Sequence, residues 1–175
     1  TIHEIREMQI VNMGQYAHGN QPIQHMIYLY NYAGEPWKAQ YWARETMDRL
    51  YSPTPDGHPG DEDNGQSSVW YVFSSMGFYP VTPGADQYVL GSPVFPKVTI
   101  ELENGNEILI EAPGNRDDTR YIEKMYMNGE EYNKNYLNYD ELMDGARIKF
   151  EMSEEPNKER GTDKSAYPYS FSDEK

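Results

Sequence analysis

The chain has 175 residues and a formal net charge of -14, which argues against nucleic acid or an anionic membrane as partner, because binding phosphate requires a basic patch. It has no cysteine, so disulfides and thiolate metal sites are excluded. No apolar run approaches the roughly 20 residues that span a bilayer, and no signal peptide is present. Because the chain opens on Thr1 without an initiator Met, we expect a longer parent polypeptide.

Aromatic residues make up 14% of the chain, and they compensate for a hydrophobic content of only 37%. Sixteen Tyr and three Trp supply much buried surface per residue, and their flat faces also suit sugars. Any single tyrosine is more often a half-buried packing residue than a ligand contact.

The first 80 residues are predicted to be helical. A weak helix over residues 3–13 ends at Gly14. A second helix begins at Pro22, since proline suits a first helical position, and Gly34 closes it. The third begins at Glu35-Pro36 and stops at the Ser-Pro-Thr-Pro sequence 52–55.

A fourth helix is predicted to run to Gly77, with Asp63 or Asn64 as its cap. Short connections between consecutive helices favour antiparallel packing, as in a helical bundle or an α/α barrel.

After residue 80 the pattern changes to that of strands. Residues 97–102 alternate cleanly, Asn104-Gly105 supplies hairpin-turn chemistry, and 107–112 run back. Strands are also predicted over 121–127 and 147–152. We therefore expect an α+β chain with helices over 1–80, an antiparallel β-region over 81–157 and a flexible polar tail over 158–175.

Between the third and fourth helices lies a glycine-bracketed acidic loop, residues 56–65, with three consecutive acids at 61–63. Read as an EF-hand, it fails, because Gln66 and Val72 occupy the sixth and twelfth positions counted from Asp61. A calcium site of another kind, acid–base chemistry and a merely solvated loop all stay open.

As catalytic carboxylates, Asp61 and Asp63 are well placed, since the helix N-terminus that follows stabilises an anion. Gly60 and Gly65 let the backbone turn sharply and a ligand approach closely. Ordinary helix capping by the same acids is the alternative interpretation.

The second polar loop contains His18, Asn20 and Gln21, and His25 follows it. The two histidines are seven positions apart, whereas a helical zinc pair needs four, which argues against zinc. The amides and the imidazole form a donor–acceptor array suited to hydroxyl groups, unless Asn20 or Gln21 merely caps the helix.

Taken together, these motifs resemble the C-terminal part of glycoside hydrolase family 92, the calcium-dependent exo-acting α-mannosidases, over residues 14–157. The sequences that carry the resemblance are His18-Gly19-Asn20-Gln21-Pro22-x-x-His25, Tyr28-x-Tyr30-x-x-Ala33-Gly34-x-Pro36-Trp37, Asp56-Gly57-x-x-Gly60-Asp61-Glu62-Asp63-x-Gly65-Gln66-x-Ser68-x-Trp70-Tyr71-Val72, Met76-Gly77-Phe78-Tyr79-Pro80-Val81 and Gly91-Ser92-Pro93-x-Phe95.

The resemblance implies that residues 1–80 form part of an (α/α)6 barrel, followed by antiparallel β-sandwich-like elements, and that the parent is secreted or periplasmic. It also implies inverting hydrolysis of terminal α-mannosides, in which two carboxyl groups about 6.5–9.5 Å apart leave room for water. Asp63, and with it Asp61, would be the general-base pair of the reaction.

The resemblance further implies Ca²⁺, with Asn20, Gln24 and Asp63 in its neighbourhood, and sugar subsites lined by His18, Gln21 and His25. No segment here matches the family's catalytic acid, so we expect the isolated chain to be inactive and the remainder of its parent to be its partner, together with mannose-containing glycans. The alternative is a non-catalytic carbohydrate-binding or structural module.

Overall fold

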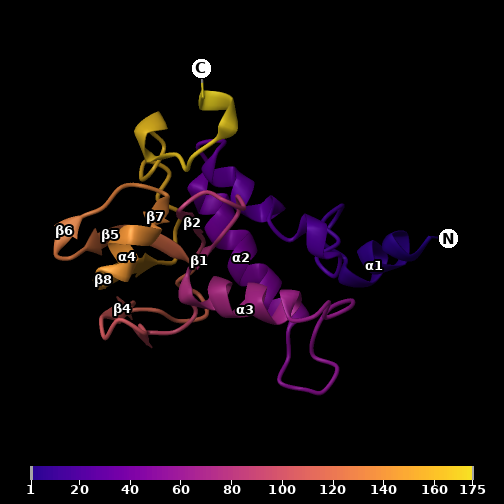
Figure 1. Cartoon of the computed structure of the whole chain (residues 1–175). Helices are drawn as coiled ribbons and strands as arrows, with labels where there is room; N and C mark the ends of the chain where they lie inside the picture. The colour runs from indigo at the N-terminus through magenta and orange to yellow at the C-terminus, as the bar shows by residue number, and fades with distance from the viewer. Residues whose placement is uncertain (1, 175) are drawn as a thin grey trace.

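A computed structural model describes residues 2–174, which form a helical half and a half built on β-sheets (Figure 1). Helix α1, His3–Val11, ends at Asn12, whose φ of 51° is left-handed. Helix α2 spans Pro36–Leu50 and helix α3 spans Gln66–Met76. Short 3₁₀ helices cover Gln21–Ile23 and Met26–Asn31.

The helix predicted from Pro22 to Gly34 is not continuous. The carbonyl of Gln24 accepts hydrogen bonds from the Tyr16 hydroxyl at 3.1 Å and the Trp70 indole N–H at 3.2 Å. The amide of Tyr28 bonds instead to the carbonyl of His25, three positions back. Tertiary contacts thus take the acceptor that an α-helical turn would use, and 3₁₀ geometry results.

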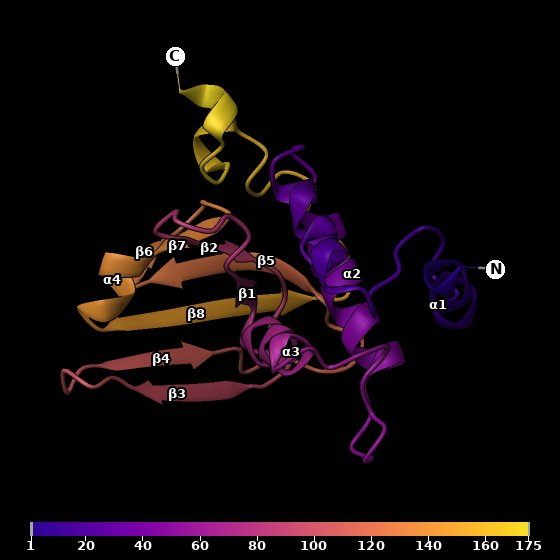
Figure 2. The same cartoon turned by 45° about the vertical axis from the view of Figure 1, so that its right-hand side comes forward.

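Helix α2 follows its predicted boundaries. Gly34, with φ of 74°, ends the preceding segment, and Pro36 occupies the first turn. Ala39, Ala43 and Met47 recur at one-face helical spacing and are buried. The segment 26–31 packs against α2, whereas α3 crosses its far end at a steep angle (Figures 1 and 2).

Eight strands of the described chain form two sheets. Strands β1 Phe78–Tyr79, β2 Gln87–Leu90 and β7 Tyr136–Asn138 pair antiparallel in that order. The larger sheet has the order β3-β4-β8-β5-β6, and its strands are β3 Lys97–Glu101, β4 Glu107–Glu111, β8 Ala146–Ser153, β5 Tyr121–Met127 and β6 Glu130–Glu131.

The two sheets share one hydrophobic core, which makes the β-region sandwich-like (Figure 2). Leu90 and Leu137 come from the smaller sheet, and Ile110, Met125 and Phe150 come from the larger one. The short helix α4, Tyr139–Met143, follows β7 and buries Leu142 in the same core. The predicted α+β class is confirmed, although β4 and β8 pair parallel rather than antiparallel.

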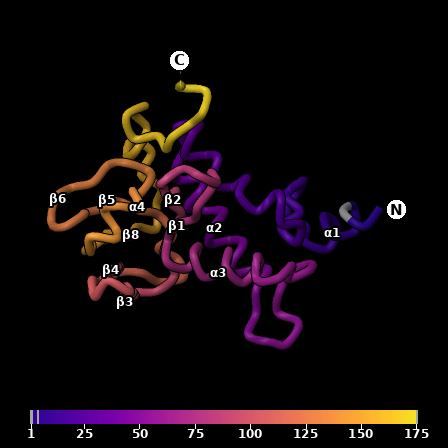
Figure 3. The backbone as a smooth tube through the Cα atoms, viewed as in Figure 1, coloured from indigo at the N-terminus to yellow at the C-terminus, as the bar shows by residue number. Residues whose placement is uncertain are grey.

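The backbone trace shows the segment after β8 folding back over the start of α2 (Figure 3). Arg160 is buried and donates to the carbonyls of Tyr132 at 3.0 Å and Lys134 at 3.1 Å. The hydroxyl of Tyr167 lies so close to Gly34 that a Cβ added there would meet it at 2.2 Å, and the Tyr167 side chain would have to move. The segment predicted to be a flexible tail therefore makes buried polar and close packing contacts.

Candidate active site

The turn that contains Asn20 and the acidic loop touch through glycine backbones. A Cβ added to Gly60 would lie 2.5 Å from the carbonyl oxygen of Gly19, and one added to Gly19 would lie 3.0 Å from the Gly60 amide nitrogen. Side chains at either position would separate the turns. Two loops 40 residues apart in sequence are thus held side by side, because both positions lack a Cβ.

Side-chain amides connect the two turns further. The Gln21 amide donates to the carbonyl oxygen of Asp61, and the Ser67 hydroxyl donates to that oxygen at 3.2 Å. Gln24, fully buried, donates to Ser67 Oγ at 3.3 Å and to the His18 carbonyl at 3.2 Å. The backbone of Asp61 is therefore fixed from the opposite turn, while its side chain is exposed.

Gly65 is the N-cap residue of helix α3, and Glu62, rather than Asp63 or Asn64, supplies the side chain that bonds to its first turn. Its carboxylate accepts the Gly65 N–H at 2.5 Å and the hydroxyl and N–H of Ser68 at 2.7 and 3.3 Å. The Ser68 hydroxyl and the Gly65 amide hold the pKa of Glu62 below its usual value. Because Asp63 and Asn64 take left-handed φ values of 51° and 57°, the loop doubles back and brings the longer Glu62 side chain to the helix.

His18 lies beneath this junction, completely buried. Its Nδ1 shares a 2.7 Å hydrogen bond with the hydroxyl of Tyr16, and its Nε2 shares one of 2.7 Å with that of Tyr51. The imidazole packs edge-on to the Trp70 ring at 4.2 Å between centroids. Burial lowers the pKa of His18 to about 3, so the ring is neutral near pH 7.

The structure separates the predicted site residues into two groups. Asp61 and Asp63 are exposed, and Asn20, Gln21 and His25 are partly exposed, so a ligand can reach all five. His18 and Gln24 are fully buried with their polar atoms bonded internally, so they support the site and do not line it.

The residues expected near calcium are too few to complete a coordination shell by themselves. The Gln24 amide is buried, and its oxygen accepts from the Gln66 amide at 3.4 Å. Residues 2–174 contain no group of three His, Cys, Asp or Glu side chains that could hold a metal ion. Calcium takes roughly six to eight oxygen ligands, so Asn20 and Asp63 do not complete a site.

Several supporting residues were not singled out from the sequence. Tyr51 and Trp70 stack at 5.8 Å and flank His18, and the Gln66 amide donates to the Tyr79 hydroxyl at 2.9 Å. The high tyrosine content indicated such contacts without locating them.

Exposed carboxylates before helix α3 thus lie beside side-chain amides, above a layer of packed aromatic rings. Residues 1–154 match the glycosyl hydrolase family 92 catalytic domain. The chain therefore belongs to this family.

Solved structures of the same family are closely similar. The inverting mannosidase BT2199 from Bacteroides thetaiotaomicron is 54% identical with a TM-score of 0.88, over 97% of this chain and 23% of that one. The α-mannosidase BT3965 from the same organism, in complex with mannoimidazole, is 43% identical with a TM-score of 0.88, over 91% of this chain and 21% of that one.

A curated relative is described as an uncharacterized secreted glycosidase from Arthroderma benhamiae. It is 28% identical over 140 residues, which make up 78% of this chain and 18% of that protein. The chain thus spans about a fifth of the length of the relatives that it matches. Within residues 2–174, no helix combines the length and apolar character needed to cross a bilayer.

Proposed function

We propose that this chain is part of a longer, secreted or periplasmic exo-acting α-mannosidase that removes terminal α-linked mannose with inversion. The observation that carries the proposal is the contact between the Asn20 turn and the acidic loop, through Gly19, Gly60 and the bond from Gln21 to the Asp61 carbonyl. Family membership and the names of the similar mannosidases support it.

In this proposal Asp63 is the general base that takes a proton from the attacking water, and Asp61 is its partner. Gln21 and His25 contact sugar hydroxyls, for which amide and imidazole groups offer both donors and acceptors. The buried His18 and Gln24 hold the turn that presents them. The general acid is supplied by the remainder of the parent polypeptide.

Calcium remains a proposal for the parent protein, with Asn20 and Asp63 as the ligands that this chain would contribute. When bound, the ion would orient sugar hydroxyls by its charge. The other oxygens of its shell would come from elsewhere in the parent.

Stereochemistry tests the proposed reaction. In the parent protein acting on an aryl α-mannoside, we expect time-resolved proton NMR to show β-mannose first, followed by mutarotation, because an inverting enzyme places water on the face opposite the leaving group. Appearance of α-mannose first, or no release of mannose, would contradict the proposal.

A further inference from the structure

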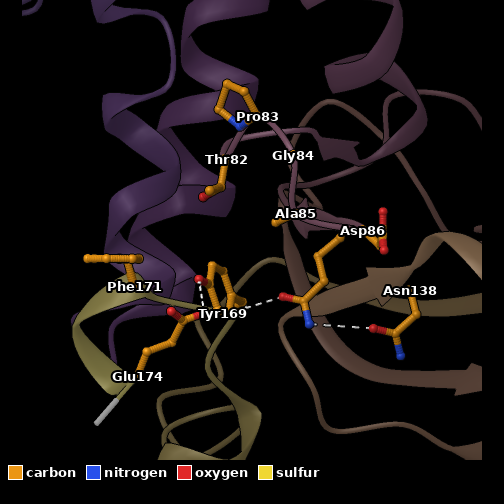
Figure 4. A pocket seen from close by; sticks show the side chains of 10 residues that line it. Thr82, Pro83, Gly84, Ala85, Asp86, Asn138, Tyr169, Phe171 and Glu174 are labelled. Atoms are coloured by element: carbon orange, nitrogen blue, oxygen red, sulfur yellow. Dashed lines mark hydrogen bonds between the residues drawn. The ribbon is translucent and has the colours of Figure 1, made fainter.

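A hollow lies at the other end of helix α2 from the acidic loop, and we call it the C-terminal hollow. It has a volume of about 520 Å³ and lies between residues 82–87 and the segment 169–174 (Figure 4). Its described lining residues are Thr82, Pro83, Gly84, Ala85, Asp86, Gln87, Asn138, Tyr169, Phe171 and Glu174. None of these residues was assigned to the candidate active site.

The 15 residues of α2 keep the two sites apart. Gly34, next to the start of α2, packs against Tyr167, while Tyr51, directly after its end, contacts His18. At 1.5 Å per residue the helix is roughly 22 Å long. The C-terminal hollow therefore lies too far away to share a sugar ring with the acidic loop.

The wall formed by the C-terminal segment is held in place by specific contacts. The Tyr169 N–H donates to Gln87 Oε1 at 2.7 Å, and the Tyr169 hydroxyl donates to Glu174 Oε1 at 2.6 Å. Upstream, Arg160 bonds to Asn135 in the connection before β7, and Tyr167 packs against Gly34 before the start of α2. This wall also lies outside residues 1–154, which the family match covers.

The polar groups of the hollow suit hydroxyl groups. Gln87 and Asn138 form an amide pair at 3.5 Å, and Asp86 and Glu174 add carboxylate acceptors (Figure 4). Amides and carboxylates together offer both donors and acceptors to a polyhydroxylated ligand.

Aromatic surface completes the hollow. Phe171 is 78% exposed and Tyr169 is 36% exposed. Both rings line the hollow and offer apolar surface on which the ring face of a sugar can pack.

Charge narrows the class of ligand. Among the described lining residues there are two carboxylates and no Lys, Arg or His, which disfavours phosphate, sulfate or a nucleotide. The volume falls within the range of about 300–1,000 Å³ typical of small-ligand sites.

We propose that the C-terminal hollow is a secondary saccharide-binding site that holds a remote part of a polymeric or branched glycan. The choice of a mannose-containing glycan as ligand rests on the proposed function. Phe171 supplies the stacking face, and Gln87, Asn138 and Asp86 bond to hydroxyls.

Kinetics on two substrates test this site in the full-length parent protein. For Phe171→Ala we expect KM for branched α-mannan to rise by about threefold to tenfold, with kcat unchanged, because one stacking ring is lost. Kinetics on a small aryl α-mannoside should not change, since that substrate cannot reach the hollow. Phe95→Ala removes another exposed ring, 45% exposed and outside the hollow, and should leave both substrates unaffected.

An unchanged KM for mannan in Phe171→Ala, or an equal change on the aryl mannoside, would overturn the secondary site. If the unmutated parent hydrolyses neither substrate, the proposed function fails separately. Electrophoresis in a mannan-containing gel then tests the hollow alone: retardation that is lost in Phe171→Ala supports it, and equal migration of both proteins refutes it.

Discussion

The imidazole of His18 joins three segments of the candidate active site. Its two nitrogens bond to the hydroxyls of Tyr16 and Tyr51, and its ring makes an edge-to-face contact with Trp70 on helix α3. Because both nitrogens already have partners and no water reaches the ring, protonation inside the folded protein is unfavourable. The residue therefore couples the geometry of the site to pH.

Replacing His18 with Gln should remove part of the acid sensitivity of the protein. The native pKa of about 3 lies below the unfolded value near 6.5, so the unfolded state binds the proton first. The contribution to stability is complete above about pH 6.5 and falls towards pH 3 by up to about 1.4 kcal/mol per pH unit. Urea unfolding between pH 4 and 7 measures how the free energy of unfolding changes with pH. An identical pH dependence in His18→Gln and in the unmutated protein would disprove the prediction.

The contact between Gly19 and Gly60 gives a test at a single position. Gly60→Ala should reduce kcat/KM of the parent on an aryl α-mannoside by more than about tenfold, because the new Cβ meets the Gly19 backbone at 2.5 Å and moves the acidic loop.

Gly14→Ala is the matched control for Gly60→Ala. Its φ of 67° equals the 68° of Gly60 to within a degree, and nothing lies within 4 Å of the added Cβ. Both variants pay the same left-handed strain of about 1–2 kcal/mol, so an equal loss of activity in the two would show that backbone strain, and not the contact, matters.

At the scale of elements, the position of the segment after β8 depends on the hydrogen bonds of Arg160. Burial lowers the pKa of Arg160 to about 10, and its guanidinium bonds to Asn135 Oδ1 at 3.3 Å as well as to two carbonyls. Arg160→Leu leaves those acceptors unpaired, which should cost about 2–3 kcal/mol and release the segment.

Limited proteolysis with chymotrypsin, read by mass spectrometry, detects that release as faster cleavage after Tyr169 and Phe171, each of which is followed by serine. Arg147 is exposed on β8, so the Arg147→Leu variant should be cleaved at the same rate as the unmutated protein. Equal cleavage rates in Arg160→Leu and Arg147→Leu would contradict the anchoring role of Arg160.

Glycine, proline and turn residues in the sequence correctly predicted several element boundaries. Gly34 and Pro36 bracketed the start of α2, Gly77 ended α3, and Asn104-Gly105 lies in the turn between β3 and β4. The break at Gln24 was not predictable, because it depends on contacts from Tyr16 and Trp70. The parallel pairing of β4 with β8 likewise has no turn signal, since those strands are not consecutive in the chain.

The candidate site was predictable as a pair of loops but not as a set of contacts. Glycine spacing and residue type indicated the Asn20 turn and the acidic loop. Which side chains are buried depends on tertiary packing, so His18 and Gln24 were expected at the ligand surface and instead support it. The cap by Glu62 follows from the left-handed conformations of Asp63 and Asn64, which no local pattern announced.

At the scale of the whole molecule, the candidate active site and the C-terminal hollow are formed by different parts of the chain. The helical half brings the acidic loop and the Asn20 turn together, and the C-terminal segment forms a wall of the C-terminal hollow near the start of α2. The chain spans about a fifth of the length of its relatives, so under the proposed function the general acid and the other calcium ligands would come from the rest of the parent polypeptide.

The proposed general base is tested most directly by the rate of mannose release from an aryl α-mannoside by Asp63→Asn of the parent protein. We predict a fall in kcat of about 10²–10⁴-fold with an unchanged circular dichroism spectrum, since the amide cannot accept the water proton. Asp56→Asn, an exposed acid of the same loop, should retain the unmutated rate. Full activity in Asp63→Asn, or an equal loss in Asp56→Asn, would contradict the account.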